Sequence, residues 1–175
     1  LYLIIALLIA ACVNKIDDEI KEGNIPISFS VKTSKTTTKA AKSTFETGDR
    51  TGVFAMLTGS SLDKQRYIDN LLLECGEGSK LIPKKEVYYP EGDATLDFIS
   101  YYPYQTASVS KGSSLLNVAV QADQSKAADY SLSNFMTARI EDVSNSEKTV
   151  KLEYKHQFAK IKLVLTPKEG EDADD

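Results

Sequence analysis

The sequence predicts an all-β protein, an antiparallel Greek-key β-sandwich of about seven to nine strands with little helix. Three observations lead to this prediction. Apolar residues fall at alternate positions or in short runs, Gly, Pro, Asn, Asp and Ser bound these runs, and no segment beyond the N-terminal apolar run has a convincing helical period. Short alternating segments separated by turn residues are typical of antiparallel β proteins.

The chain begins with an uncharged apolar run, residues 1–11, that ends in Ile9-Ala10-Ala11-Cys12. Small residues before a cysteine form a bacterial lipobox, in which a signal peptidase cleaves before Cys12 and the Cys12 thiol carries the lipid anchor. The run is shorter than the roughly 20 apolar residues that span a bilayer, and it lacks an initial methionine and a basic segment. We therefore expect a lipoprotein signal peptide with a truncated start at 1–11, and an acidic, lipidated tether at 12–24.

The first predicted strand covers residues 25–31, where apolar side chains alternate with proline and serine as in a half-buried strand. These side chains are Ile25, Ile27, Phe29 and Val31. Further strands are expected at 53–57, 67–73, 87–89, 96–102, 115–120, 135–140, 150–154 and 158–165. The apolar positions change parity between the last two segments, which predicts a bulge or corner at 155–158. Together these strands form a predicted domain over 25–166, and the acidic run 167–175 is expected to link it to a missing C-terminal domain.

A basic cluster follows the first strand directly. Lys32, Lys35, Lys39 and Lys42 are separated by Thr, Ser and Ala, with no aromatic or long apolar residue between them. This composition is typical of an exposed loop. Exposed loops of this kind are also open substrates for a trypsin-like protease, so both interpretations remain.

Charge and cysteine content exclude other classes. The formal net charge is −4, and apart from that cluster the basic residues are spread out, so we expect no nucleic-acid partner. The only cysteines are Cys12 and Cys75. If Cys12 is acylated, Cys75 has no intramolecular partner, and its surroundings predict an inert, half-buried thiol.

The sequence offers little for catalysis. His156 is the only histidine, which rules out His-pair metal sites, and no Gly-x-Ser-x-Gly motif surrounds a serine nucleophile. His156 is in phase with Val150 and Leu152, so we expect a buried, hydrogen-bonded corner residue. We predict that the chain is not an enzyme and has no metal or cofactor.

Tyrosines gather in the middle of the chain. They are Tyr88, Tyr89, Tyr101, Tyr102 and Tyr104. Exposed aromatic rings can form a carbohydrate- or protein-binding surface, whereas tyrosines within strands also pack in the core and at sheet edges. The sequence leaves both roles open.

Several segments resemble, in order, the fimbrillin family of Bacteroidetes, which contains the subunits of type V pili. Besides the lipobox they are FETGDRTGVFA (45–55), VYYP (87–90), LDFISYYPY (96–104), SNFMTA (133–138) and YKHQFAKI (154–161). The resemblance implies a transthyretin-like N-terminal domain that is followed by a second β domain. It places Arg50 in a characteristic turn, where we expect it to be buried.

The resemblance also implies a function. It implies a lipoprotein precursor that is exposed on the cell outer membrane, anchored there through lipid on Cys12, and cut by a trypsin-like protease after the first strand. That strand, 25–31, then leaves, and a strand of another fimbrial subunit replaces it in a pilus that supports adhesion. Lys39 and Lys42 match the place where family members carry a basic residue. Because lysine stands where an Arg-specific protease needs arginine, the alternative is an uncleaved anchor or accessory lipoprotein that binds a glycan or a host protein.

Overall fold

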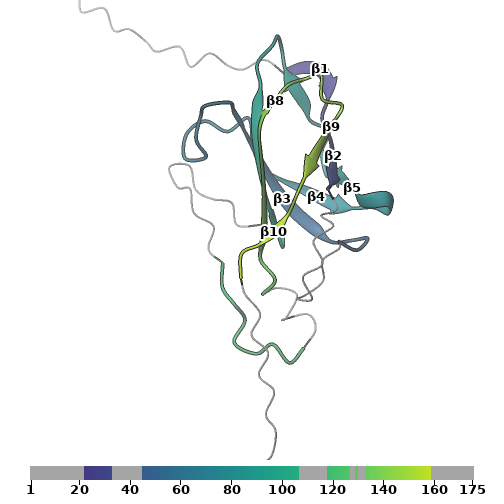
Figure 1. The fold of residues 1–175 in the computed structure, drawn as a ribbon, viewed down its shortest axis with the longest axis vertical. Coiled ribbons are helices and arrows are strands. Elements are labelled where there is room, and N and C mark those ends of the chain that lie inside the picture. The colour runs from purple at the N-terminus through teal and green to yellow at the C-terminus, as the bar shows by residue number, and fades with distance from the viewer. Residues whose placement is uncertain (1–21, 33–44, 107–117, 127–128, 130–132, 159–175) are drawn as a thin grey trace, which may run out of the picture.

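The computed structural model describes residues 22–32, 45–106, 118–126, 129 and 133–158. Within these residues the elements with described bounds are β-strands and one short 3₁₀ turn (Figure 1), and Asp129 has helical backbone. The strands are β1 (Glu22–Pro26), β2 (Ser28–Val31), β3 (Arg50–Leu57), β4 (Ile68–Cys75), β5 (Lys80–Pro83), β6 (Tyr88–Pro90), β7 (Leu96–Tyr102), β8 (Met136–Val143), β9 (Thr149–Leu152) and β10 (Lys155–His156), and the turn η1 is Glu77–Ser79. The prediction of an all-β chain with little helix is confirmed over these residues.

One curled sheet carries most of the fold, with strand order β10-β8-β7-β3-β4-β5-β2-β9, and β1 pairs with β6 in a small second sheet. The consecutive strands β9 and β10 lie at opposite edges of the large sheet, although only Glu153 and Tyr154 separate them. Three Cα–Cα steps span at most about 11 Å. The sheet must therefore curl until its two edges approach one another, which gives it the shape of a half-barrel.

The large sheet is mixed. β2 runs antiparallel to β5 but parallel to β9, with Phe29 opposite Val150. The prediction of an antiparallel Greek-key sandwich therefore needs two corrections. The pair β2–β9 is parallel, and the described strands form one curled eight-stranded sheet with a small two-stranded sheet in place of two large packed sheets. The alternation of apolar residues indicates which face of a sheet a side chain takes, but it does not identify the neighbouring strand or its direction.

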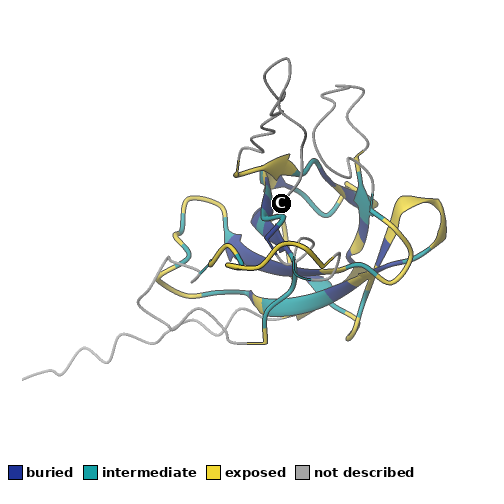
Figure 2. Ribbon diagram, turned by 90° about the horizontal axis from the view of Figure 1, so that it is seen from below, coloured by how far each residue is buried: buried dark blue, intermediate teal, exposed yellow. Residues whose placement is uncertain are grey.

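The concave face of the sheet holds the main core. Its buried side chains come from nearly every strand of the large sheet, and Phe29 and Phe98 meet edge to face there with ring centroids 5.8 Å apart. β3 is buried on both faces, since Val53 and Ala55 face the main core while Phe54 and Met56 belong to a second cluster with Tyr101. Figure 2 shows the buried stretches following the curl of the sheet.

The first predicted strand is two strands. β1 ends at Pro26 and pairs with β6, whereas β2 begins at Ser28 and joins the large sheet. Between them the Ile27 N–H donates to the Val87 carbonyl at 2.9 Å. Ile25 is 45% exposed, so its predicted place on the inward face is wrong, because the chain leaves the large sheet before reaching it.

Two other expectations need correction. His156 is exposed, although its ring does hydrogen-bond, with Nδ1 2.8 Å from Asn134 Oδ1. The phase with β9 fails because the chain changes sheet edge at Glu153–Tyr154, before the predicted corner. Arg50 is also exposed and pairs with Glu74 at 3.2 Å.

Two predicted strands and Cys75 remain to be compared with the structure. Residues 118–120 of the predicted strand 115–120 form no strand, and the predicted strand 158–165 lies, apart from residue 158, outside the described residues. Cys75 is buried. Its burial, and to a lesser extent the negative charge of Asp49, raise the pKa of its thiol, in agreement with an inert cysteine. In the part of the chain that the structure describes, no helix has the length and apolar character needed to cross a membrane.

Candidate functional site

The strand β2 is the candidate for exchange, and it is held on both edges. Phe29 and Ser30 pair with Leu81 and Lys80 of β5, and residues 28–31 pair with residues 149–152 of β9. Taking β2 away would leave β5 and β9 with unpaired backbone groups facing a gap. Such edges are templates for another strand.

The side chains of β2, together with Ile27 directly before it, fill the concave face beneath that gap. Ile27 and Phe29 are each 3% exposed, and Val31 packs partly buried against the same core. Ser28 is exposed and Ser30 half-buried on the other face. Burying an isoleucine or phenylalanine side chain contributes about 1.5–3 kcal/mol each, so the two buried anchors contribute about 3–6 kcal/mol to holding the segment. The sequence correctly predicted the inward positions of Ile27 and Phe29.

Both residues that flank the segment 33–44 contact the link between β9 and β10. The Lys32 N–H donates to the Leu152 carbonyl at 2.8 Å, and Lys32 Nζ lies 2.8 Å from Glu153 Oε2. The hydrogen bond and charge of Lys32 lower the pKa of Glu153. At the other end, the Phe45 ring packs on Tyr154 at 4.7 Å between centroids. The predicted cleavage positions Lys39 and Lys42 lie outside the described residues, as does Cys12.

Tyr154 fixes this link against the sheet. Its hydroxyl lies 2.6 Å from Ser100 Oγ, which in turn donates to the Gly52 carbonyl at 2.8 Å. Burial raises the pKa of Tyr154 to about 12, so the phenol stays protonated at neutral pH. No local sequence pattern predicts this contact, because it joins residues from three separate segments.

The small sheet β1–β6 has an open structure. Glu22 pairs with Pro90 and Pro26 with Tyr88, with an irregular stretch between them. Hollows of about 300 Å³ and 310 Å³ line its two sides, the first beside Ile25 and the second beside Tyr88. β1 thus has weaker support than β2.

The five clustered tyrosines do not share one surface. Tyr89, Tyr101 and Tyr102 are buried, whereas Tyr88 and Tyr104 are half-buried. The Tyr88 hydroxyl donates to Glu86 at 2.9 Å, and Tyr104 packs against the second cluster. The three buried rings belong to the core, which leaves only Tyr88 and Tyr104 partly accessible.

Comparison with known proteins now identifies the family. The sequence model of the family described as "Fimbrillin-like" matches residues 38–175. The chain belongs to the fimbrillin-like family.

Relatives of this fimbrillin-like chain come from Bacteroides. A candidate fimbrium subunit of Bacteroides uniformis, Fim1C, is 25% identical over 131 residues, which are 73% of this chain and 41% of that protein. Crystal structures of candidate cell adhesion proteins from B. uniformis and B. ovatus have TM-scores of 0.57 and 0.50 at 18% and 20% identity. Each alignment covers 77% of this chain, and it covers 48% of the B. uniformis protein and 52% of the B. ovatus protein. At this level of identity the likeness shows the fold. The chain spans about half the length or less of these relatives.

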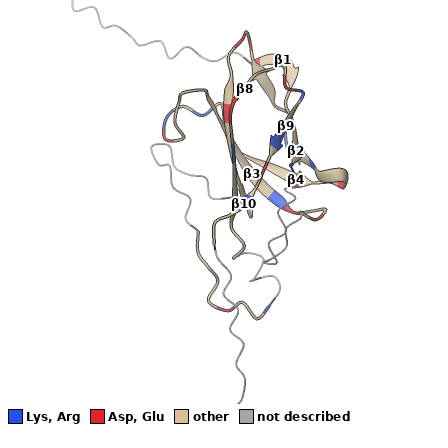
Figure 3. Ribbon diagram, in the orientation of Figure 1, with Lys and Arg blue, Asp and Glu red and all other residues tan. Residues whose placement is uncertain are grey.

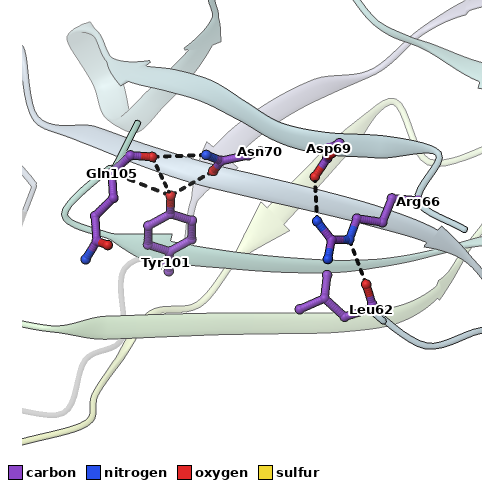
Figure 4. A network of polar contacts seen from close by, with 6 residues as sticks. All are labelled: Leu62, Arg66, Asp69, Asn70, Tyr101 and Gln105. Atoms are coloured by element: carbon purple, nitrogen blue, oxygen red, sulfur yellow. Dashed lines mark hydrogen bonds and ion pairs between the residues drawn. The ribbon is translucent and has the colours of Figure 1, made fainter. Parts of the chain in front are cut away.

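A polar network on the convex face of the fimbrillin-like sheet was missed by the sequence analysis (Figure 4). The Tyr101 hydroxyl donates to Asn70 Oδ1 at 2.7 Å, and Asn70 Nδ2 donates to the Gln105 carbonyl at 3.0 Å. Beside it, Arg66, whose side chain is buried, donates to the Leu62 carbonyl at 2.6 Å, and its guanidinium carbon lies 5.3 Å from the centre of the Phe54 ring. These contacts join β4 to the end of β7 and fix the loop before β4, so the network positions the strands.

Asp97 is a buried carboxylate with a similar role. It accepts hydrogen bonds from the Thr58 hydroxyl and the Asp142 N–H, both at 2.9 Å, and from the Gly59 N–H at 3.4 Å. Burial acts to raise the pKa of Asp97, but these hydrogen bonds outweigh it and the pKa lies below its ordinary value. Asp97 thereby pins the register shift between β7 and β8.

Charged groups do not gather into a catalytic or metal centre over the described ranges. No group of three His, Cys, Asp or Glu side chains among these residues could hold a metal ion. Acidic and basic residues are interspersed along the strands and turns (Figure 3). The candidate functional site among the described residues is therefore the position of β2, where the backbone groups of β5 and β9 bind a strand.

Proposed function

We propose that this fimbrillin-like chain is the precursor of a type V pilus subunit. In this proposal, Cys12 carries the lipid that holds the precursor on the cell outer membrane, with the domain exposed on the surface. A protease cuts at Lys39 or Lys42, β2 leaves the sheet, and a strand of another subunit takes its place. The resulting pilus supports cell adhesion.

The placement of β2 is the observation that carries the proposal. A strand that is paired on both edges cannot be lost without exposing two backbone ladders and the pockets of Ile27 and Phe29. An incoming strand would restore both at once, which is the basis of β-augmentation. The segment 33–44 lies between β2 and β3 in the sequence, so one cut there would separate β2 from β3 and would leave every described strand whole.

Family membership supports the pilus role. The matched family is fimbrillin-like, and the curated relative is described as a candidate fimbrium subunit. Association with further subunits and a cell-surface location are what such a subunit needs. The lipobox at Cys12 supplies a route to that surface.

The test is limited proteolysis of the purified full-length protein, followed by intact mass and by detection of polymers. We expect trypsin to cut at Lys39 or Lys42 first, and polymers to appear only after the cut. A variant with Lys35→Gln, Lys39→Gln and Lys42→Gln, which removes every lysine of residues 33–44, should stay monomeric. The matched variant Lys84→Gln with Lys85→Gln, which leaves residues 33–44 unchanged, should polymerise as the parent does.

An absence of cleavage in 33–44, or cleavage without strand exchange, would contradict the shaft-subunit proposal. The alternative role is then an uncleaved anchor or accessory lipoprotein that binds a glycan or host protein. A glycan array comparing the parent with Tyr88→Ala and Tyr104→Ala, the two partly accessible tyrosines, tests that alternative directly. Specific binding that both substitutions abolish would support it.

A further inference from the structure

We infer that the groove between β5 and β9 selects its donor strand by charge as well as by shape, taking a segment in which an aromatic residue is followed three positions later by a lysine or arginine that meets Glu153. This inference rests on the proposed strand exchange. It specifies the chemistry of the partner strand, using the strand that now fills the groove as the template.

The aromatic requirement comes from the floor of the groove. Phe29 is directly opposite Leu81 on one side and Val150 on the other, and both of these side chains are buried. Its ring meets the Phe98 ring at an interplanar angle of 81°, an edge-to-face arrangement that aromatic pairs prefer. A smaller side chain at this place would leave a void in a closely packed core.

The spacing comes from the parallel pairing of β2 with β9. In this pair the two strands advance together, from Phe29 opposite Val150 to Val31 opposite Leu152. The next step places residue 32 beside residue 153, and the Lys32 N–H indeed still donates to the Leu152 carbonyl. A cation three residues after the aromatic ring therefore falls next to Glu153, whereas one at another spacing does not.

The charge preference comes from Glu153 itself. Its carboxylate lies 2.8 Å from Lys32 Nζ, and the two side chains are 37% and 59% exposed. An acidic residue at position 32 would bring two like charges together at the end of the groove. Like-charge contacts of this kind reject wrong partners more effectively than the matched pair adds affinity.

The experiment uses the full chain with a site-specific protease recognition sequence placed within residues 33–44. After cleavage, the nicked chain is incubated with a labelled peptide of residues 22–32, and uptake is measured by anisotropy and gel filtration. Peptides with Phe29→Ala, Lys32→Gln or Lys32→Glu are compared with a Ser28→Ala control, because Ser28 points outward and is exposed. The uncut chain, whose own strand stays tethered, serves as the blank.

We expect the Phe29→Ala peptide to lose about 100-fold or more in affinity. For an exposed ion pair, Lys32→Gln should lose about twofold to fivefold and Lys32→Glu more, and these losses should shrink in 1 M salt while the Phe29→Ala loss does not. Ser28→Ala should bind like the parent peptide. In a Glu153→Lys chain the order of the charged peptides should reverse, whereas Asp93→Lys, in an exposed turn, should leave it unchanged.

The outcomes separate the two proposals. If the parent peptide is never taken up, strand exchange itself fails, and this inference with it. If the parent peptide is taken up but Lys32→Glu binds equally well, or the Glu153→Lys chain keeps the original order, exchange stands and charge selection is wrong. Equal binding of the Phe29→Ala peptide would overturn the aromatic requirement.

Discussion

The substitution Phe29→Ala tests the role of the first strand in the stability of the uncut chain. Phe29 is 3% exposed and packs against Phe98. Removing a buried phenylalanine ring costs the transfer free energy of its atoms plus the cavity left behind, about 3–5 kcal/mol in total. Ile25→Ala is the matched control, because Ile25 lies in the same segment but is 45% exposed, and its truncation should cost about 1 kcal/mol or less.

Urea unfolding measures both variants. The chain has no tryptophan, so far-UV circular dichroism and tyrosine fluorescence are the probes. For a slope of about 2 kcal/mol per molar urea, the Phe29→Ala loss lowers the unfolding midpoint by about 1.5–2.5 M without changing the slope. If Phe29→Ala and Ile25→Ala lower the midpoint equally, β2 does not occupy the groove in solution as described, and the proposed strand exchange is wrong.

Three further predictions concern other parts of the sheet. A Cβ at Gly52 would overlap the ring of Tyr101 at Cε1, so Gly52→Ala should destabilise the fold by about 1–3 kcal/mol in urea unfolding. The loss should be smaller in a Tyr101→Ala background, where that clash is absent. The pKa of Asp97 is lowered in the fold, so its contribution to stability is complete above the ordinary value of 3.8 and is lost as the pH falls through the lowered pKa. Asp97→Asn should therefore cost about 1–3 kcal/mol of the free energy of unfolding at pH 7 and flatten this part of the acid-unfolding profile. In a Cys12→Ser chain, the buried Cys75 should react with a thiol reagent about 10³-fold or more slowly than in urea, as followed by mass.

Distinct results would contradict each of these three. An equal cost of Gly52→Ala in both backgrounds would mean that the Tyr101 ring does not lie across β3. A parent and an Asp97→Asn chain with parallel acid profiles would remove the carboxylate from the acid response. Rapid labelling of Cys75 in native buffer would show that the core around it opens readily.

The sequence predicted side-chain burial correctly where the alternation of apolar residues within one strand determines which face each side chain takes. Alternation placed Ile27 and Phe29 inward, and the absence of a nearby cation predicted an inert Cys75. It failed at His156, because a period-2 phase holds only while the strand continues, and the chain leaves β9 after Leu152. Ile25 failed for the same reason at the other end, where the chain joins β6.

Features that depend on distant segments were beyond such reasoning. The parallel pairing of β2 with β9 brings together residues from the two ends of the described chain, and no local pattern encodes that partnership. Arg66 is buried only because a loop folds it over Phe54 and supplies the Leu62 carbonyl and Asp69 as partners. An arginine between Gln65 and Tyr67 gives no signal of this kind in the sequence.

The two-residue link at Glu153–Tyr154 also sets what happens to the sheet once its first strand has gone. Because the link connects β9 at one edge of the sheet to β10 at the other, and β10 pairs with β8, it keeps β9 close to β8. β9 would also be too constrained to close the gap by moving against β5 without breaking the Tyr154–Ser100 contact. An emptied groove would therefore keep its width and its open ladders, a state that is costly to maintain and prone to aggregate. Such a subunit is safest if the outgoing strand departs only as the incoming one arrives, which makes concerted replacement the natural course of exchange in this fold.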